Sequence, residues 1–248
     1  MWNMIWLFFH KLASPKHFYR ISGLLIPWLA AITAILLVVG LYLGLFVAPP
    51  DYQQGQSYRI IFVHVPSAWM SMFIYTFMAV LSAIYLIWNI KLADVMARSS
   101  ALLGASFTLL ALATGSLWGK PMWGAWWVWD ARLTSELILL FLYMGYIALV
   151  MAIEDVRTAA RAGAVLILVG VVNIPIIHYS VEWWNTLHQG PTVTKLDKPS
   201  IHLSMLVPLL LMAGAFQFYY FTVVLMRARG ELLDRERRSE WVRELVGR

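Results

Sequence analysis

Long apolar stretches separated by short polar segments dominate the chain. Six of these stretches are long enough to cross about 30 Å of hydrocarbon as α-helices. They cover residues 24–47, 67–88, 101–118, 137–153, 163–181 and 203–226. The pattern therefore predicts an all-α polytopic membrane protein with six transmembrane helices. We expect a single integral membrane domain over residues 1–248, with no separate soluble domain.

The composition agrees with this expectation and removes several chemistries. The 248 residues are 61% hydrophobic and 13% charged, with a mean hydropathy of +0.70, which is more apolar surface than a soluble domain of this size can bury. The chain has no cysteine. Disulfides, thiolate metal sites and thioether attachment of haem through a C-x-x-C-H motif are therefore excluded.

The distribution of Lys and Arg predicts the orientation. Fourteen of the nineteen basic residues lie in the N-terminus, in the loops at 89–100 and 154–162, and in the C-terminal tail. By the positive-inside rule both termini are cytoplasmic, and the two longest connections, 119–136 and 182–202, lie outside. Residues 1–20 place an apolar patch before their basic residues, which is the reverse of a signal peptide. We expect an interfacial cytoplasmic segment there.

Two further features of the chain concern packing and the tail. The tail, residues 227–248, carries seven Arg and five acidic residues. Pairs such as Glu231–Arg235 favour a solvated helix, and docking to a cytoplasmic partner or to anionic lipid is the alternative.

Two glycine motifs, Gly40-x-x-x-Gly44 and Gly115-x-x-x-Gly119, are interpreted as sites of close helix approach.

Tryptophan is concentrated in the outer segment around residues 118–134, between the third and fourth helices. Five of the thirteen Trp fall within twelve residues: Trp118, Trp123, Trp126, Trp127 and Trp129. An aromatic belt at the membrane surface explains one or two of them. Gly119, Pro121 and Gly124 argue against a continuous helix. The five rings are therefore interpreted as either a belt or a rigid apolar platform for a flat ligand such as a porphyrin.

Charged residues flank this Trp-rich loop. Lys120, Arg132 and Arg59 each either anchor a helix end at the headgroups or bind the carboxylates of a ligand, which suit guanidinium groups. Asp130 precedes the fourth helix, a position that favours helix capping. Pairing of Asp130 with Arg132 or Lys120 is the alternative.

Four of the six histidines are expected near the outer face. They are His64, His178, His188 and His202. Pro66 predicts the first turn of the second helix, so His64 should lie just before that helix. Residues 182–190 are expected to form a short interfacial helix with Trp183, Trp184 and Leu187 toward lipid or ligand. Imidazole is a common axial ligand of haem iron, but spacing alone does not select a pair.

Several activities are disfavoured by the motifs that the sequence lacks. It has no G-x-x-x-x-G-K-[ST] phosphate loop for ATP hydrolysis and no H-E-x-x-H zinc motif. The apolar stretches contain almost no ionisable residue near their centres, which argues against a proton-coupled carrier.

The segment from Trp123 to Thr134, with the pattern W-G-x-W-W-x-W-D-x-R-L-T, resembles the WWD signature of haem-handling proteins. The similarity extends over the whole chain, through His64-Val-Pro66, residues 176–190 and the six stretches. The chain resembles the family of cytochrome c maturation protein C, also called haem exporter protein C. The related cytochrome c haem lyases share the signature, but they have many more helices.

The resemblance implies a function, a site and partners. Haem of the b type, held non-covalently, would be bound at the outer face of the bacterial inner membrane, with the Trp-rich loop as platform. His64 and His188 match the family's axial ligands, whereas His178 and His202 do not. The protein would pass haem to a periplasmic haem chaperone. A small single-helix partner and a separate ABC transporter would complete the complex, so the chain itself would not be an enzyme and would not bind nucleic acid.

A function of another class remains open from the residues alone. A b-type haem redox subunit of a membrane electron-transfer complex would bury haem deep in the bundle, with histidines in mid-helix. The predicted histidines lie near helix ends, which favours a haem donor. In the donor interpretation Arg59 and Arg132 hold the propionates, and Trp183 and Trp184 are further outer contacts.

Overall fold

The computed structural model describes residues 14–184, 186–188, 190, 193 and 198–247. Most of the predicted interfacial segment at the N-terminus, residues 1–13, lies outside these residues. The described chain is helical, with only an isolated two-residue bridge between Asp51 and Gly55. Its α-helices are α2 (Pro15–Tyr42), α3 (Ile61–Trp88), α4 (Lys91–Trp123), α5 (Ala131–Ala152), α6 (Val156–Gly170), α7 (Asn173–Trp183), α8 (Leu203–Arg235) and α9 (Glu240–Val246). A π-helical turn, η1 (Leu43–Val47), and a 3₁₀ turn, η2 (Ser57–Ile60), lie between α2 and α3.

The prediction of six membrane spans is confirmed. Six helical segments are long and apolar enough to cross a membrane, and each coincides with one of the predicted stretches, although the fourth ends one residue before its prediction. The fifth span is divided into α6 and α7 at Val171 and Val172. Pro175 explains the break, because its ring has no N–H and clashes with the carbonyl four residues earlier, at Val171.

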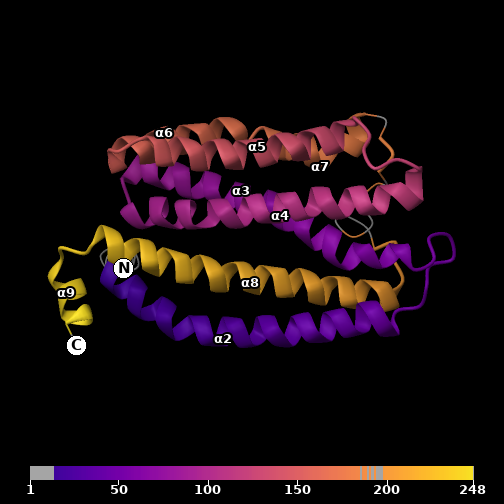
Figure 1. Cartoon of the computed structure of the whole chain (residues 1–248), viewed down its shortest axis with the longest axis horizontal. Helices are drawn as coiled ribbons and strands as arrows, with labels where there is room; N and C mark the ends of the chain where they lie inside the picture. The colour runs from indigo at the N-terminus through magenta and orange to yellow at the C-terminus, as the bar shows by residue number, and fades with distance from the viewer. Residues whose placement is uncertain (1–13, 185, 189, 191–192, 194–197, 248) are drawn as a thin grey trace.

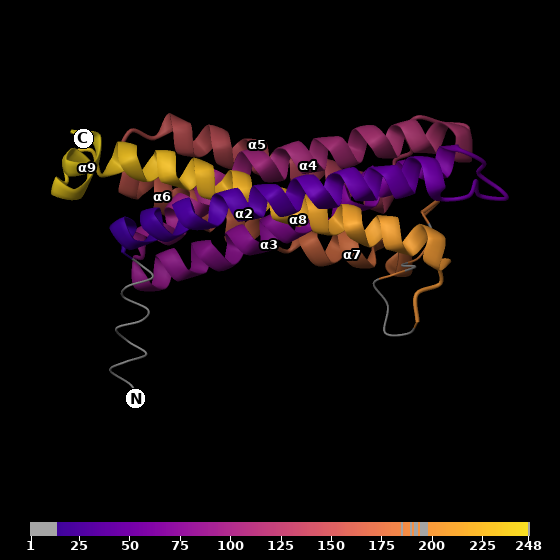
Figure 2. The same ribbon diagram turned by 90° about the horizontal axis from the view of Figure 1, so that it is seen from below.

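The helices run roughly parallel to one another in an elongated bundle (Figures 1 and 2). α2 packs against α8 on one side, α5, α6 and α7 form the other side, and α3 and α4 lie between them. The described chain begins and ends at the same end of the bundle, next to α9. We call this the basic end. The connections at 48–56 and 124–130, and the described residues between Trp184 and His202, lie at the opposite end, which we call the loop end.

Two helix boundaries at the loop end differ from the prediction. α3 begins at Ile61, so Pro66 lies inside the helix and His64 is helical as well. α4 continues through Gly119 and Pro121 to Trp123 and ends at Gly124, whose φ of +73° is readily adopted by glycine. Both helices continue through their prolines, although each proline removes one backbone hydrogen bond. The connection between α4 and α5 is therefore only residues 124–130.

The core at the centre of the bundle is rich in aromatic side chains, and two of its tyrosine hydroxyl groups form hydrogen bonds between helices. Tyr143 on α5 donates to the carbonyl oxygen of Ser71 on α3 at 2.7 Å, and Tyr220 on α8 bonds the Ser100 hydroxyl at 2.8 Å. All four residues are buried. These bonds cross between helices and satisfy groups that would otherwise be costly to bury.

Close approach of helices at glycine is confirmed for Gly40 and Gly44. A Cβ at Gly40 would lie 3.0 Å from the Met212 sulfur on α8, and one at Gly44 would lie 2.7 Å from the Phe62 ring on α3. Gly104 is tighter still, because a Cβ there would overlap the buried ring of Tyr143.

We expect Gly104→Ala to destabilise the bundle by roughly 1–3 kcal/mol, the usual cost of overpacking a core. Gly145→Ala on α5 is the matched control, since nothing lies within 4 Å of a Cβ at that position. There the gain in helix propensity should leave stability unchanged or raised by about 0.5–1 kcal/mol. Thermal unfolding of both variants in the same detergent measures the difference. Equal midpoints would show that the Tyr143 contact does not limit the packing.

Candidate functional site

A cavity of about 620 Å³ opens between α3, α4, α5 and α7 at the loop end. Its lining combines apolar side chains with a few polar ones, as is typical of small-molecule sites. Six lining residues carry the chemistry discussed below: His64, Trp118, Trp123, Arg132, Glu136 and His188.

His64 points from the first turn of α3 toward α4. Its Nδ1 lies 3.0 Å from the Ala111 carbonyl oxygen and 3.1 Å from the Thr114 hydroxyl. A carbonyl oxygen only accepts, so Nδ1 carries the proton and Nε2 has the free lone pair. Gly115 provides space for the ring, because a Cβ there would lie 3.0 Å from His64 Cε1. This tautomer is the one that ligates a metal through Nε2.

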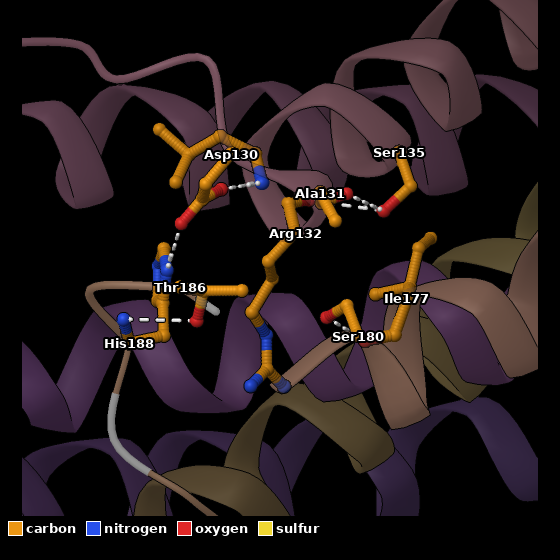
Figure 3. Close-up of polar contacts among 9 residues, drawn as sticks. Asp130, Ala131, Arg132, Ser135, Ile177, Ser180, Thr186 and His188 are labelled. Atoms are coloured by element: carbon orange, nitrogen blue, oxygen red, sulfur yellow. Dashed lines mark hydrogen bonds and ion pairs between the residues drawn. The ribbon is translucent and has the colours of Figure 1, made fainter. Parts of the chain in front are cut away.

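His188 reaches the same cavity from the segment that follows α7. Its Nδ1 lies 3.1 Å from Asp130 Oδ2, and the backbone N–H of His188 donates to the Thr186 hydroxyl at 3.2 Å. Figure 3 shows the Asp130 carboxylate between the His188 ring and the start of α5. The carboxylate fixes the proton on Nδ1, so Nε2 of His188 is again the free nitrogen.

Asp130 has a second role at the same position. Its Oδ1 accepts the backbone N–H of Leu133 at 2.8 Å and so caps α5. The prediction that Asp130 is a helix cap is confirmed. Its side-chain partner in the structure is His188, whereas the sequence had suggested Arg132 or Lys120.

The environment of His188 favours a neutral ring. Burial lowers the pKa of His188 below its ordinary value, and the nearby Asp130 carboxylate partly opposes this. Neutral imidazole is the form that binds a metal, so protons compete with a metal for this nitrogen only at acidic pH.

The five tryptophans of the predicted platform lie in different environments. Trp118 and Trp123, on the last turns of α4, line the cavity. Trp118 contacts the His64 ring edge-on at 5.7 Å and Trp123 contacts the His188 ring edge-on at 4.8 Å. Trp126 and Trp129 are 55% and 75% exposed and do not line the cavity, and Trp127 packs edge-on against Trp129 at 5.4 Å.

Of the predicted propionate-binding residues, Arg132 alone lines the cavity. Figure 3 shows its side chain extending between Thr186 and Ser180. Arg59 instead donates to the carbonyl oxygens of Gly44 and Ala48 and to the Gln56 side chain, and so ties η1 to η2. Lys120 donates to the Gly124 carbonyl at 3.0 Å and lies 6.0 Å from the Trp126 ring. Neither cation faces the cavity.

The expected short helix over residues 182–190 is wrong for the part that the structure describes. α7 ends at Trp183, and Trp184 is extended with φ −135° and ψ 155°. Residues 185 and 189 lie outside the described part of the chain. Trp183 and Trp184 are both about half exposed, and neither lines the cavity. Beyond the end of α7, His188 contacts Asp130.

Comparison with known proteins decides the family. The family model described as Heme exporter protein C matches residues 8–243. Heme exporter protein C of Escherichia coli (strain K12) is 54% identical over 242 residues, 98% of each chain. The protein of the same name from Haemophilus influenzae is 51% identical over 98% of each chain. A putative cytochrome c biosynthesis ccmC-like mitochondrial protein of Marchantia polymorpha is 44% identical over 87% of this chain and 90% of that protein.

The chain belongs to the Heme exporter protein C family. It is therefore a multi-pass membrane protein that handles haem for cytochrome c maturation, and a transport component rather than a catalyst. The resemblance found in the sequence is confirmed, as are the all-helical fold and the haem-handling role.

Sequence reasoning missed several residues that line or support this cavity. Gln54 accepts from the Trp118 indole N–H at 3.0 Å, and no sequence pattern indicates it. Thr114 lies one turn before Trp118 on α4, so helical spacing could have placed it beside the cavity. Glu136 lies one turn after Arg132, is 7% exposed and accepts from the Ser71 hydroxyl at 2.7 Å. A carboxyl group at the edge of an apolar stretch was the available signal.

His178 and His202 also line the cavity, although the resemblance gives them no ligand role. His202 Nδ1 accepts the backbone N–H of Ser204 at 3.2 Å and caps α8. His178 contacts the Tyr179 ring edge-on at 4.7 Å. Neither ring has the arrangement of His64 and His188, in which Nδ1 donates to an oxygen and Nε2 is left free.

Proposed function

We propose that the cavity binds b-type haem non-covalently, with His64 and His188 as the two axial ligands, and that the protein delivers this haem to a periplasmic haem chaperone. One observation carries the proposal. Two histidines from distant parts of the chain line one cavity, and each has its Nδ1 proton engaged by an oxygen of the protein. That arrangement leaves two Nε2 atoms available for iron.

The donor set suits haem better than a free metal ion. Among the described residues there is no group of three or more His, Asp or Glu side chains that could hold a metal. A porphyrin supplies four nitrogens itself, so two imidazoles complete six-coordinate iron. Because the sequence has no cysteine, the haem would be retained without a thioether link, through coordination, apolar contact and polar contacts.

Arg132 is the residue we assign to the haem propionates. It lines the cavity with His188, whereas the Arg59 guanidinium donates to carbonyl oxygens of its own chain. An arginine meets a carboxylate with two parallel hydrogen bonds, which would fix the direction of the propionate edge. Glu136 lies beside Arg132, so a propionate would compete with Glu136 for the guanidinium.

The location and partners follow from charge and family. The basic end is assigned to the cytoplasm by the positive-inside rule, which places the loop end on the periplasmic side of a bacterial inner membrane. A small single-helix protein and a separate ABC transporter are the proposed partners in the complex, with ATP hydrolysed by the transporter. His188 lies on a connecting segment at the loop end rather than in mid-helix, which supports a haem donor over a redox subunit.

A transfer experiment tests the proposal. The full-length protein is loaded with haem in detergent and mixed with a purified periplasmic haem chaperone, and the haem on each protein is followed by absorption after separation. We expect haem to leave this protein only when the chaperone is present. Haem that stays bound with chaperone present, yet exchanges electrons with a quinone, would favour the redox subunit.

The exposed tryptophans should act on transfer rather than on binding. We expect Trp126→Ala with Trp129→Ala to leave the haem spectrum unchanged and to lower the transfer rate about tenfold or more, since buried aromatic anchors dominate interfaces. We expect no effect on haem binding because both side chains are exposed and neither lines the cavity. Trp28→Ala, at an exposed position on α2, is the matched control. An unchanged transfer rate in the double variant would indicate that these rings serve only as part of an aromatic belt at the membrane surface.

A further inference from the structure

A second pocket lies at the basic end, far from the haem cavity. It has a volume of about 240 Å³ and is lined by Arg98 and Ser99 of α4 and by Arg227 and Glu231 of α8. The proposed haem function uses none of these residues. Two arginines in one small pocket between two membrane helices call for a physical explanation, because their like charges repel.

The Arg98 guanidinium is partly enclosed and incompletely hydrogen-bonded. Its Nε and Nη2 are shielded from solvent and have no hydrogen-bond partner within the described residues. Asp94 Oδ2 lies 3.5 Å from Nε, close enough for an ion pair only. Enclosed charged donors without acceptors are costly, so a group that accepts from them would stabilise this part of the fold.

The neighbouring carboxylates are already engaged elsewhere. Arg235 donates from Nη1 to Asp94 Oδ2 and from Nε to Glu231 Oε1, both at 2.7 Å. Arg227 donates from Nε to the Ser99 carbonyl oxygen at 3.2 Å. The cluster therefore contains three guanidinium groups, of Arg98, Arg227 and Arg235, against two carboxylates. One positive charge is left over, and the two arginines that line the pocket, Arg98 and Arg227, make no hydrogen bond to either carboxylate.

The depth of the pocket matches the surface of a bilayer. α4 and α8 each have 33 residues. At about 1.5 Å per residue they are about 50 Å long, roughly 20 Å more than the hydrocarbon layer. Arg98 lies about 10 Å along α4 from its start, and Arg227 lies about 12 Å along α8 from its end. Both are therefore near the boundary between hydrocarbon and headgroups at the basic end.

We propose that this pocket binds one singly charged phosphate group between α4 and α8, through Arg98 and Arg227. Guanidinium groups bind phosphate oxygens with paired, charge-assisted hydrogen bonds, and a single negative charge would neutralise the excess. Glu231 is the one carboxylate that lines the pocket, and its Oε1 is held by Arg235. The depth favours the phosphodiester of an anionic phospholipid as the source, and inorganic phosphate is the other source of the same chemistry.

The test counts lipids on the full-length protein by native mass spectrometry in detergent. Phosphatidylglycerol and phosphatidylcholine with equal acyl chains are titrated separately, and a third titration adds inorganic phosphate as competitor. Arg227→Gln and Arg98→Gln remove the two donors singly. Arg161→Gln removes an exposed arginine at the start of α6, at the same end of the bundle, and is the matched control. Haem binding at the loop end reports whether each variant is folded.

We expect phosphatidylglycerol to bind about tenfold more tightly than phosphatidylcholine, and Arg227→Gln to remove this preference while Arg161→Gln retains it. Displacement by millimolar inorganic phosphate would identify the source as solution phosphate, with the site unchanged. Equal retention of phosphatidylglycerol by Arg227→Gln and Arg161→Gln would overturn the proposal. If Arg98→Gln fails to bind haem, Arg227→Gln decides alone, because its side chain is less enclosed.

Discussion

Replacing His64 or His188 by Ala should convert six-coordinate, bis-imidazole haem into a five-coordinate form, and replacing both should abolish specific binding. Each imidazole supplies one axial bond through Nε2, and each single variant leaves the other ring in place. We expect affinity to fall by more than the roughly 10–100-fold that loss of an outer-shell partner costs. Absorption spectra of the purified protein, titrated with haem, measure both effects.

Free imidazole provides an independent readout for the same variants. An alanine at either position leaves space beside the iron, so added imidazole should restore the six-coordinate spectrum without restoring the bond between the iron and the chain. His17→Ala is the matched control, since His17 is exposed on α2 at the basic end. A five-coordinate spectrum in His178→Ala instead, with His188→Ala unchanged, would move the ligand assignment to α7.

The helices were predictable because length and apolar content are direct requirements of a bilayer. The residues at which α3 begins and α4 ends, at the loop end, were not predictable in this way. Pro66, Gly119 and Pro121 were interpreted with rules for helices in water, where a broken hydrogen bond is replaced by solvent. In the bundle the backbone stays helical through all three positions, so His64 lies within α3 and Trp118 within α4.

The site was predictable only as far as motifs reach. The resemblance named His64 and His188, and the structure brings both to one cavity, although their role as ligands remains a proposal. The contact between His188 and Asp130 joins residues 58 positions apart, and no local rule predicts it. The clustering of Trp in the sequence does not reveal that Trp118 and Trp123 face the cavity while Trp126 and Trp129 face outward.

Asp130→Asn should lower haem affinity by roughly 10–100-fold while leaving α5 and the fold in place. The carboxylate accepts from two donors at once, His188 Nδ1 and the Leu133 backbone N–H. An asparagine has one acceptor oxygen, so it satisfies one donor and presents its NH₂ group to the other. If the cap is kept, the His188 ring loses the partner that fixes its tautomer, and its bond to iron weakens.

Asp155→Asn separates this positioning role from capping alone. Asp155 caps α6 in the same way, accepting the Thr158 backbone N–H at 2.8 Å, but it lies at the basic end far from the cavity. Asparagine is about as good a cap as aspartate, so both variants should unfold near the temperature of the unaltered protein. Only Asp130→Asn should show a five-coordinate fraction in the haem spectrum, because only there does the carboxylate hold a ligand. Equal haem affinity in the two variants would reduce Asp130 to a helix cap and leave His188 without a positioning partner.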